Sequence, residues 1–195
     1  MDLVLIRHAR PHRIEDAGTA ADPELTDLGH RQAAAMARWL ADERFDALYT
    51  SPMARARQTV APLERAMEMT AEVIEGVKEY DAKSPEYIPI EDLRADKDRW
   101  HDFLTNHVQE DRTDFGRLVV STIEELIGRH RGHRIAVVCH GGVVNVWAAH
   151  VLGLGPQMFF EPFYTSVNRF VAASTGQRSV ASLNEVGHLR ALDRS

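Results

Sequence analysis

Two short apolar runs, each followed at once by a histidine, restrict the folds that this chain can adopt. One is residues 3–6, which precede Arg7 and His8, and the other is "RIAVVC" at 134–139, which precedes His140. Uninterrupted apolar runs of this length are typical of strands in a largely parallel sheet that helices cover on both faces. Ligands of such sheets bind beyond the carboxyl ends of the strands. We therefore expect both histidines at the ligand-binding edge of one sheet.

Helical and strand patterns alternate along the rest of the chain. Apolar spacing predicts amphipathic helices over 26–43, 53–67, 118–127 and 141–153. Thr26 and the pair Ser51-Pro52 are expected to begin the first two. Short strands are predicted at 45–50 and 72–74, and "SVNRFVAA" and "SVASLN" on either side of "STGQR" predict a C-terminal hairpin. The fold expected is α/β, a three-layer sandwich with a mostly parallel central sheet, helices on both faces and the hairpin at the edge.

The length of 195 residues fits a single domain over residues 1–195. Residues 81–115 are the least regular part, with about twice as many acidic as basic residues, and are expected to cross one end of the sheet. They fit a solvated loop with short helices or a substrate-binding lid. The chain carries 29 acidic and 23 basic residues, so composition gives no sign of a nucleic-acid or membrane partner.

Targeting signals and cysteine chemistry are sparse. The first apolar run is too short for the core of a signal peptide, and no window is long enough to span a bilayer, so we expect a cytoplasmic protein. The single cysteine, Cys139, excludes an intramolecular disulfide framework and a cysteine-based zinc site. A homodimer stays open, because an apolar helix or the C-terminal hairpin of one copy could pack against the same element of a second copy.

Five ionisable residues from four separate segments are expected to meet at the carboxyl edge of the sheet. They are Arg7, His8, Arg55, Glu79 and His140. A guanidinium group can donate two parallel hydrogen bonds to phosphate oxygens, and helix N-termini also favour anions. The predicted ligand is therefore a phosphoryl group, carried by a small phosphorylated substrate.

Five segments, in this order, make the chain resemble the histidine phosphatase superfamily, which includes the cofactor-dependent phosphoglycerate mutases and many small phosphatases. The segments are "LIRHAR" at 5–10, "LTDLGHRQA" at 25–33, "TSPMARARQT" at 50–59, "KEYD" at 78–81 and "VVCHGG" at 137–142. The resemblance implies that His8 is the nucleophile. It also implies a phosphate pocket of Arg7, Arg55 and His140, with Gly141 beside it.

The same resemblance implies an acidic proton donor after the third strand, which is Glu79 or, as second choice, Asp81. It implies no metal and no other cofactor. The chain departs from the family pattern after the nucleophile, where Ala9 replaces the usual glycine and is followed by Arg10. Arg10 is expected either to bind a second anionic group of the substrate or to face solvent.

The function expected is a metal-independent phosphomonoester hydrolase of the histidine acid phosphatase type, acting through a phosphohistidine on His8. A phosphoglycerate mutase and a non-catalytic phosphate- or protein-binding relative are the alternatives. A cysteine-dependent phosphatase is disfavoured because Asn145 stands where that chemistry needs an arginine, six residues after Cys139. The sequence does not identify the leaving group. Four aromatic residues near an expected rim loop fit either stacking on an aryl or sugar group or packing in the core or at a dimer surface: Phe159, Phe160, Phe163 and Tyr164.

Overall fold

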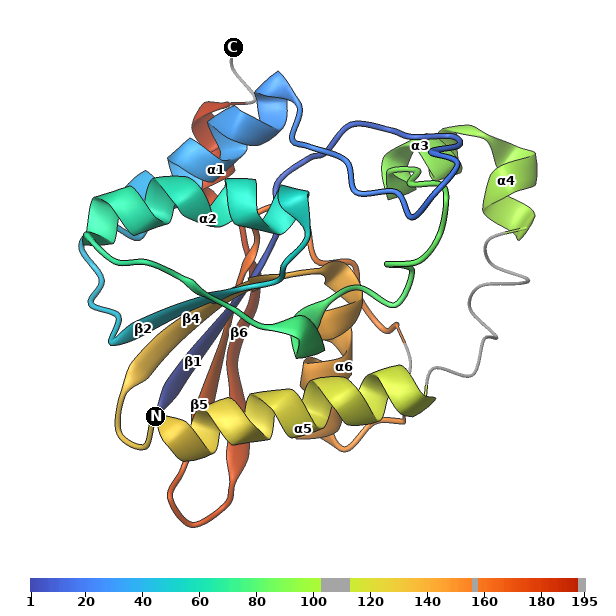
Figure 1. Ribbon diagram of the computed structural model, residues 1–195. Coiled ribbons are helices and arrows are strands. Elements are labelled where there is room, and N and C mark those ends of the chain that lie inside the picture. The colour runs from blue at the N-terminus through green and yellow to red at the C-terminus, as the bar shows by residue number, and fades with distance from the viewer. Residues whose placement is uncertain (103–112, 156–157, 193–195) are drawn as a thin grey trace.

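The computed structural model describes residues 1–102, 113–155 and 158–192. In these ranges six strands form one sheet in the order β3-β2-β4-β1-β5-β6 (Figure 1). The strands are β1 Asp2–Arg7, β2 Ala47–Thr50, β3 Glu72–Val73, β4 Arg134–Cys139, β5 Val167–Ala172 and β6 Arg178–Glu185. Strands β3, β2, β4 and β1 are parallel, whereas β5 and β6 are antiparallel to their neighbours, so the sheet is mixed.

The two apolar runs of the sequence lie side by side in the middle of the sheet. Strands β1 and β4 pair in parallel from Asp2 opposite Arg134 to Arg7 opposite Cys139. The backbone N–H of His8 then donates to the carbonyl of Cys139, over 2.9 Å. Because the strands end in register, the residues that follow them meet at one edge.

Helices cover both faces of the sheet, as the α/β prediction requires. The four longer ones are α1 Asp27–Trp39, α2 Ala54–Met67, α5 Thr113–Arg129 and α6 Gly141–Leu152. Figure 1 shows α1 and α2 on one face and α5 and α6 on the other. Alternate residues of β1 enter two separate cores, Val4 and Ile6 on the side of α1 and α2, Leu3 and Leu5 on the side of α5 and α6. This alternation explains why residues 3–6 of the strand are all apolar.

The helix starts were predicted with mixed success. Thr26 caps α1 as expected, since its hydroxyl accepts a hydrogen bond from the N–H of Gly29. The pair Ser51-Pro52 does not begin α2, and that prediction is wrong: the helix starts at Ala54, whose N–H donates to the carboxylate of Asp22. The Ser51 hydroxyl instead contacts His140.

Helix α6 is buried on more sides than an amphipathic helix would be. Val143, Val144, Trp147 and Ala148 are all fully buried, because α5 and the β6 strand pack beside α6 as well as β1. The C-terminal hairpin is confirmed, with β6 at the sheet edge.

Residues 81–115 contain two short helices, α3 Ile90–Ala95 and α4 Lys97–Asp102, while residues 103–112 of that segment lie outside the described residues. Figure 1 places α3 beside the loop that follows β1. Two single-turn helices, Glu75–Val77 and Gly187–Ala191, complete the described chain. Nowhere in the described ranges is a helix long and apolar enough to cross a membrane.

Candidate active site

A cavity of about 100 Å³ opens at the carboxyl edge of the sheet. Four of the predicted residues line it: Arg7 at the end of β1, His8 after it, Arg55 in the first turn of α2, and Glu79 after the single-turn helix that follows β3. Gly141, at the start of α6, lines it too. The fifth, His140, lies directly behind, with its ring centroid 5.1 Å from that of His8. The segments expected to converge therefore do converge.

The hydrogen bond of His8 determines which ring nitrogen can react. Nδ1 lies 2.8 Å from the carbonyl oxygen of Ala9, which can only accept, so Nδ1 carries the proton. The neutral ring then keeps its lone pair on Nε2. Burial, followed by the charges of Arg55 and Arg7, lowers the pKa of His8 well below its usual value of 6.5. The imidazole is therefore neutral, with a free lone pair, at physiological pH.

Both arginines are buried with donors that no protein group accepts. Within the described residues, Nε of Arg7 and all three nitrogens of Arg55 lack a hydrogen-bond partner. Another nitrogen of Arg7, Nη1, donates a hydrogen bond to the carbonyl oxygen of Pro162. Arg55 forms long ion pairs with Asp22 and Asp81, at 3.8 and 4.0 Å. Buried donors of this kind normally have acceptors, so the arrangement fits an anion held between the two side chains.

The guanidinium groups of the two arginines each lie over a tyrosine ring. The guanidinium carbon of Arg55 lies 4.7 Å from the ring centroid of Tyr87, and that of Arg7 lies 4.1 Å from the ring of Tyr164. Both rings also pack against His8. Tyr87 was not predicted as a site residue, because it lies in the irregular segment without a motif. Tyr164 had been noted only as one of four aromatics near the rim.

His140 is a buried, neutral imidazole. Its Nε2 lies 2.8 Å from the hydroxyl of Ser51, and its Nδ1 has no hydrogen-bond partner among the described residues. Burial lowers the pKa of His140 well below 6.5, and Arg55 and His8 lower it further. When the Ser51 hydroxyl donates to Nε2, Nδ1 carries the proton. Ser51 was missed as a site residue because its Ser-Pro pair was interpreted as a helix start.

Glu79 has the environment of a general acid. Its carboxyl group accepts hydrogen bonds from the N–H of Gly142 at 2.9 Å and of Tyr80 at 3.0 Å. Burial, with the neighbouring charge of Asp81 as second cause, nevertheless raises the pKa of Glu79 to about 7. Asp81, the second choice from the sequence, also lines the cavity.

The loop after His8 is held in place by the segments that carried the resemblance. The N–H of Ala9 donates to the hydroxyl of Thr59, which itself donates to the carbonyl of Arg55. Gly29 lies so close to this loop that a Cβ there would be 2.1 Å from the carbonyl oxygen of Arg10. The "LTDLGHRQA" segment thus needs glycine at this position for close backbone approach.

Arg10 and Cys139 lie outside the cavity. Arg10 forms ion pairs with Glu91 at 3.4 Å and Asp92 at 3.7 Å on α3, and it is not among the residues that line the cavity. The structure thus does not bring Arg10 together with the other predicted site residues. Cys139 is fully buried in β4, and burial raises the pKa of its thiol, which leaves it as an unreactive strand residue. Asn145 joins α6 to the backbone of Phe159 and Phe160 through three hydrogen bonds, and its side-chain amide also donates to the carbonyl of Gly141 within the helix.

Two neutral histidines and two buried arginines at the strand ends of an α/β sheet define an anion-binding protein suited to phosphoryl groups. The sequence matches the family model of the histidine phosphatase superfamily (branch 1) over residues 3–185, and the chain belongs to that superfamily.

Similarity to individual proteins extends over nearly the whole chain for one relative and over about two thirds of it for another. A protein of Hydrogenobacter thermophilus, named provisionally as phosphoserine phosphatase 2, is 26% identical over 204 residues, covering 97% of this chain and 98% of that protein. A protein of Yersinia pestis, named provisionally as phosphoglycerate mutase GpmB, is 23% identical over 141 residues, covering 69% of this chain and 66% of its own length.

Solved structures of low sequence identity share the fold. A phosphoserine phosphatase of Entamoeba histolytica, in complex with phosphoserine, superposes with a TM-score of 0.76 at 24% identity, covering 96% of this chain and 98% of its own. A mycobacterial glucosyl-3-phosphoglycerate phosphatase superposes with a TM-score of 0.77 at 19% identity, covering 95% and 99%. These likenesses confirm the predicted α/β fold.

Proposed function

We propose that this protein is a phosphomonoester hydrolase that acts through a phosphohistidine on His8 and needs no metal ion. One observation carries the proposal: around the free Nε2 of His8, buried guanidinium donors of Arg7 and Arg55 and the buried Nδ1 of His140 lack hydrogen-bond partners within the described residues. Leaving such donors unpaired costs free energy, roughly 1–3 kcal/mol for each neutral group and more for a charged one. A bound phosphoryl group offers oxygen acceptors to all three side chains.

The first chemical step is an in-line displacement. The lone pair on Nε2 of His8 attacks phosphorus, so that an N–P bond forms while the bond from phosphorus to the leaving oxygen breaks. Arg7, Arg55 and His140 stabilise the negative charge on the three equatorial oxygens. Because the pKa of His8 is lowered, the ring does not have to lose a proton before it attacks.

Glu79 serves the two steps in opposite protonation states. With its pKa raised to about 7, a large fraction of the carboxyl groups is protonated near neutral pH and can give a proton to the departing alkoxide. The resulting carboxylate then takes a proton from the water that attacks the phosphohistidine. Phosphate is released and the carboxyl group is protonated again.

Hydrolysis is favoured over mutase chemistry by the surroundings of the cavity. A mutase must hold a bisphosphorylated intermediate, which needs cations for a second phosphate. Arg10, the best candidate for that role, is paired with Glu91 and Asp92. The names of the relatives that align over nearly the full chain are also those of phosphatases.

The proposal is tested by phosphate release from 4-nitrophenyl phosphate in the presence of a chelator. We expect turnover by the wild type, none by His8→Ala, and a loss of at least about a hundredfold in Arg55→Ala. Arg57→Ala is the matched control, because Arg57 lies two residues further along α2 and is exposed. Turnover by His8→Ala, or loss of wild-type activity on chelation, would contradict the proposal.

A further inference from the structure

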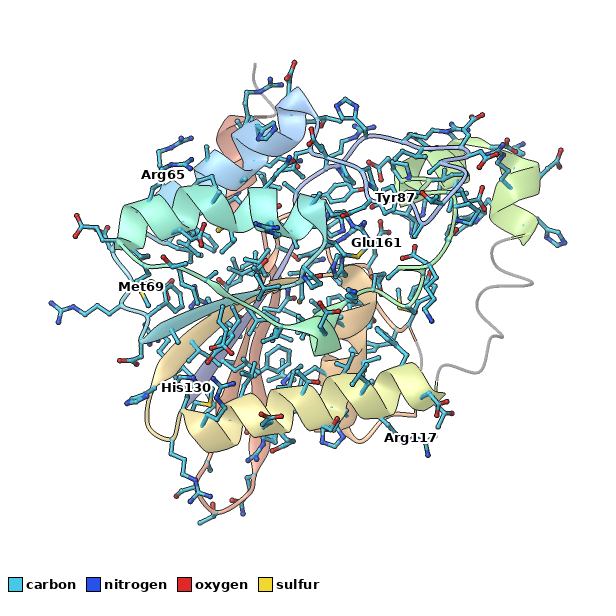
Figure 2. The ribbon with its side chains drawn as sticks, viewed as in Figure 1. Arg65, Met69, Tyr87, Arg117, His130 and Glu161 are labelled. Carbon is cyan, nitrogen blue, oxygen red and sulfur yellow. The ribbon has the colours of Figure 1, made fainter. Side chains whose placement is uncertain are left out.

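The part of the cavity beyond the phosphoryl pocket has an apolar wall. Ile88, Ile90 and Leu93, from the start of α3 and the residues before it, line one side, and Met158 lines another. Glu161 adds a carboxylate to this lining, and Asp81, which forms an ion pair with Arg55 at 4.0 Å, adds a second one nearer the phosphoryl pocket. In Figure 2, Glu161 and Tyr87 are found on the side of the sheet where α3 lies. This outer part is where the alcohol portion of a bound ester would lie.

The charges around the cavity are distributed unevenly. In the described lining the cations are Arg7 and Arg55, and both belong to the phosphoryl pocket. A phosphate dianion bound there uses their charge. Once the charge of Arg55 is used by the phosphate, the carboxylates of Asp81 and Glu161 give the rest of the lining negative charge, to which a protonated Glu79 adds none.

Two nearby arginines do not correct this imbalance. Arg10 is engaged by Glu91 and Asp92 outside the cavity. Arg94 pairs with Glu161 at 2.5 Å, but its side chain is half exposed and does not line the cavity. The pair fixes Glu161 at the rim, between α3 and the segment that leads to β5. A carboxylate or second phosphate on the substrate would therefore meet carboxylates and apolar side chains.

We infer that the substrate is a phosphomonoester whose leaving alcohol carries no second anionic group, being neutral or cationic and in part apolar. This inference rests on the proposed function. An anionic alcohol would lose its hydration against Ile88, Ile90 and Leu93 and be repelled by Asp81 and Glu161. A neutral or ammonium-bearing alcohol meets neither obstacle.

Two pairs of esters that differ by a carboxylate test the inference. The first pair is glycerol 3-phosphate and 3-phosphoglycerate, and the second is phosphoethanolamine and phosphoserine. We expect kcat/KM to be larger by about tenfold or more for the member without the carboxylate in each pair. Equal or reversed values, with turnover of all four esters, overturn the inference and leave the proposed function standing. No turnover of these esters or of 4-nitrophenyl phosphate overturns the proposed function itself.

Two variants of one ion pair separate charge from structure. Glu161→Gln removes a rim carboxylate and frees Arg94, so the discrimination against 3-phosphoglycerate should fall by about fivefold. Arg94→Gln breaks the same contact but leaves the carboxylate without its counter-charge, so the discrimination should rise. Changes of opposite sign support the inference. Changes of the same sign in both variants would mean that the ion pair acts by holding α3, and would overturn the role given to the rim charge.

Discussion

The carboxyl group of Glu79 accepts a hydrogen bond over 2.9 Å from the backbone N–H of Gly142, 63 positions away in the chain. This contact joins the segment after β3 to the first turn of α6, directly after His140. A Cβ at position 142 would lie 2.2 Å from Oε1 of Glu79, so glycine is needed there if the carboxyl group is to stay where it is. This hydrogen bond therefore fixes the position of the proposed acid, Glu79, relative to the phosphoryl pocket.

Replacing the proposed acid should affect poor leaving groups most. In Glu79→Gln the alkoxide must leave without a proton, so hydrolysis of an alkyl phosphate should fall by about 10²–10⁴-fold. A 4-nitrophenolate leaves readily as an anion, and formation of the phosphoenzyme from its ester should change little. Rapid-mixing measurements of the first turnover with both esters test this. Equal losses would reassign the acid, with Asp81 as the next candidate.

A smaller change at Gly142 should reproduce part of that effect. Gly142→Ala places a methyl group against Oε1 of Glu79, and the carboxyl group must move aside. We expect a selective loss for alkyl phosphates together with a modest loss of thermal stability, because the N–H of Gly142 loses its acceptor and the ring of Tyr80 also lies 3.2 Å from the added Cβ. Gly128→Ala is the control, since a Cβ there meets nothing within 4 Å. Unchanged alkyl phosphate hydrolysis would show that the position of Glu79 is not critical.

Stability should depend on pH through the buried imidazole of His8. Its pKa in the folded protein is well below 6.5, and in the unfolded chain it returns to about 6.5. Between these values the unfolded state binds more protons, so the free energy of unfolding falls as the pH drops below about 6.5. In His8→Asn the loss of stability from about pH 7.5 to about pH 5.5 should be smaller than in the wild type by on the order of 1 kcal/mol.

Urea unfolding at the two pH values measures this difference. The exposed His12 provides the matched control, because His12→Asn should leave the wild-type pH dependence in place. If His8→Asn and the wild type lost equal stability on acidification, His8 would not be buried as a neutral group.

The ring of Tyr87 should contribute to anion binding by holding Arg55. Tyr87→Phe keeps a ring below the guanidinium, whereas Tyr87→Leu removes it together with the cation–π contact, which is worth about 0.5–2 kcal/mol. Inorganic phosphate should therefore inhibit Tyr87→Leu about three- to thirtyfold more weakly than the wild type, and Tyr87→Phe within about twofold of it. Equal inhibition of the two variants would assign Tyr87 to packing alone.

The parts of the fold set by periodicity were predictable. The apolar runs before His8 and His140 identified the two central strands, and register alone then brought the histidines to one edge. The start of α2 was not predictable from Ser51-Pro52, because Asp22, from a distant loop, supplies the helix cap instead. A capping partner contributed by the tertiary fold leaves no local pattern.

The residues of the candidate site were likewise predictable only in part. Residues in motifs, such as Arg55 and Glu79, were found because the resemblance and the strand ends mark them. Tyr87 and Ser51 were not, since the role of each depends on a contact with a segment far away in the sequence. The substrate role expected for Arg10 stays a prediction: the structure shows its side chain in ion pairs with acidic residues of α3, more than 80 positions later, and that contact left no local pattern.

Trapping the covalent intermediate tests the central claim most directly. Enzyme mixed with a ³²P-labelled monoester and quenched within the first turnover should carry label on the protein that is stable in alkali and lost in acid, as a phosphoramidate is. The label should be absent from His8→Ala and present in the Arg57→Ala control. Label that survives acid, as a phosphate ester would, or turnover by the wild type with no protein-bound label at any time, would contradict a phosphohistidine on His8.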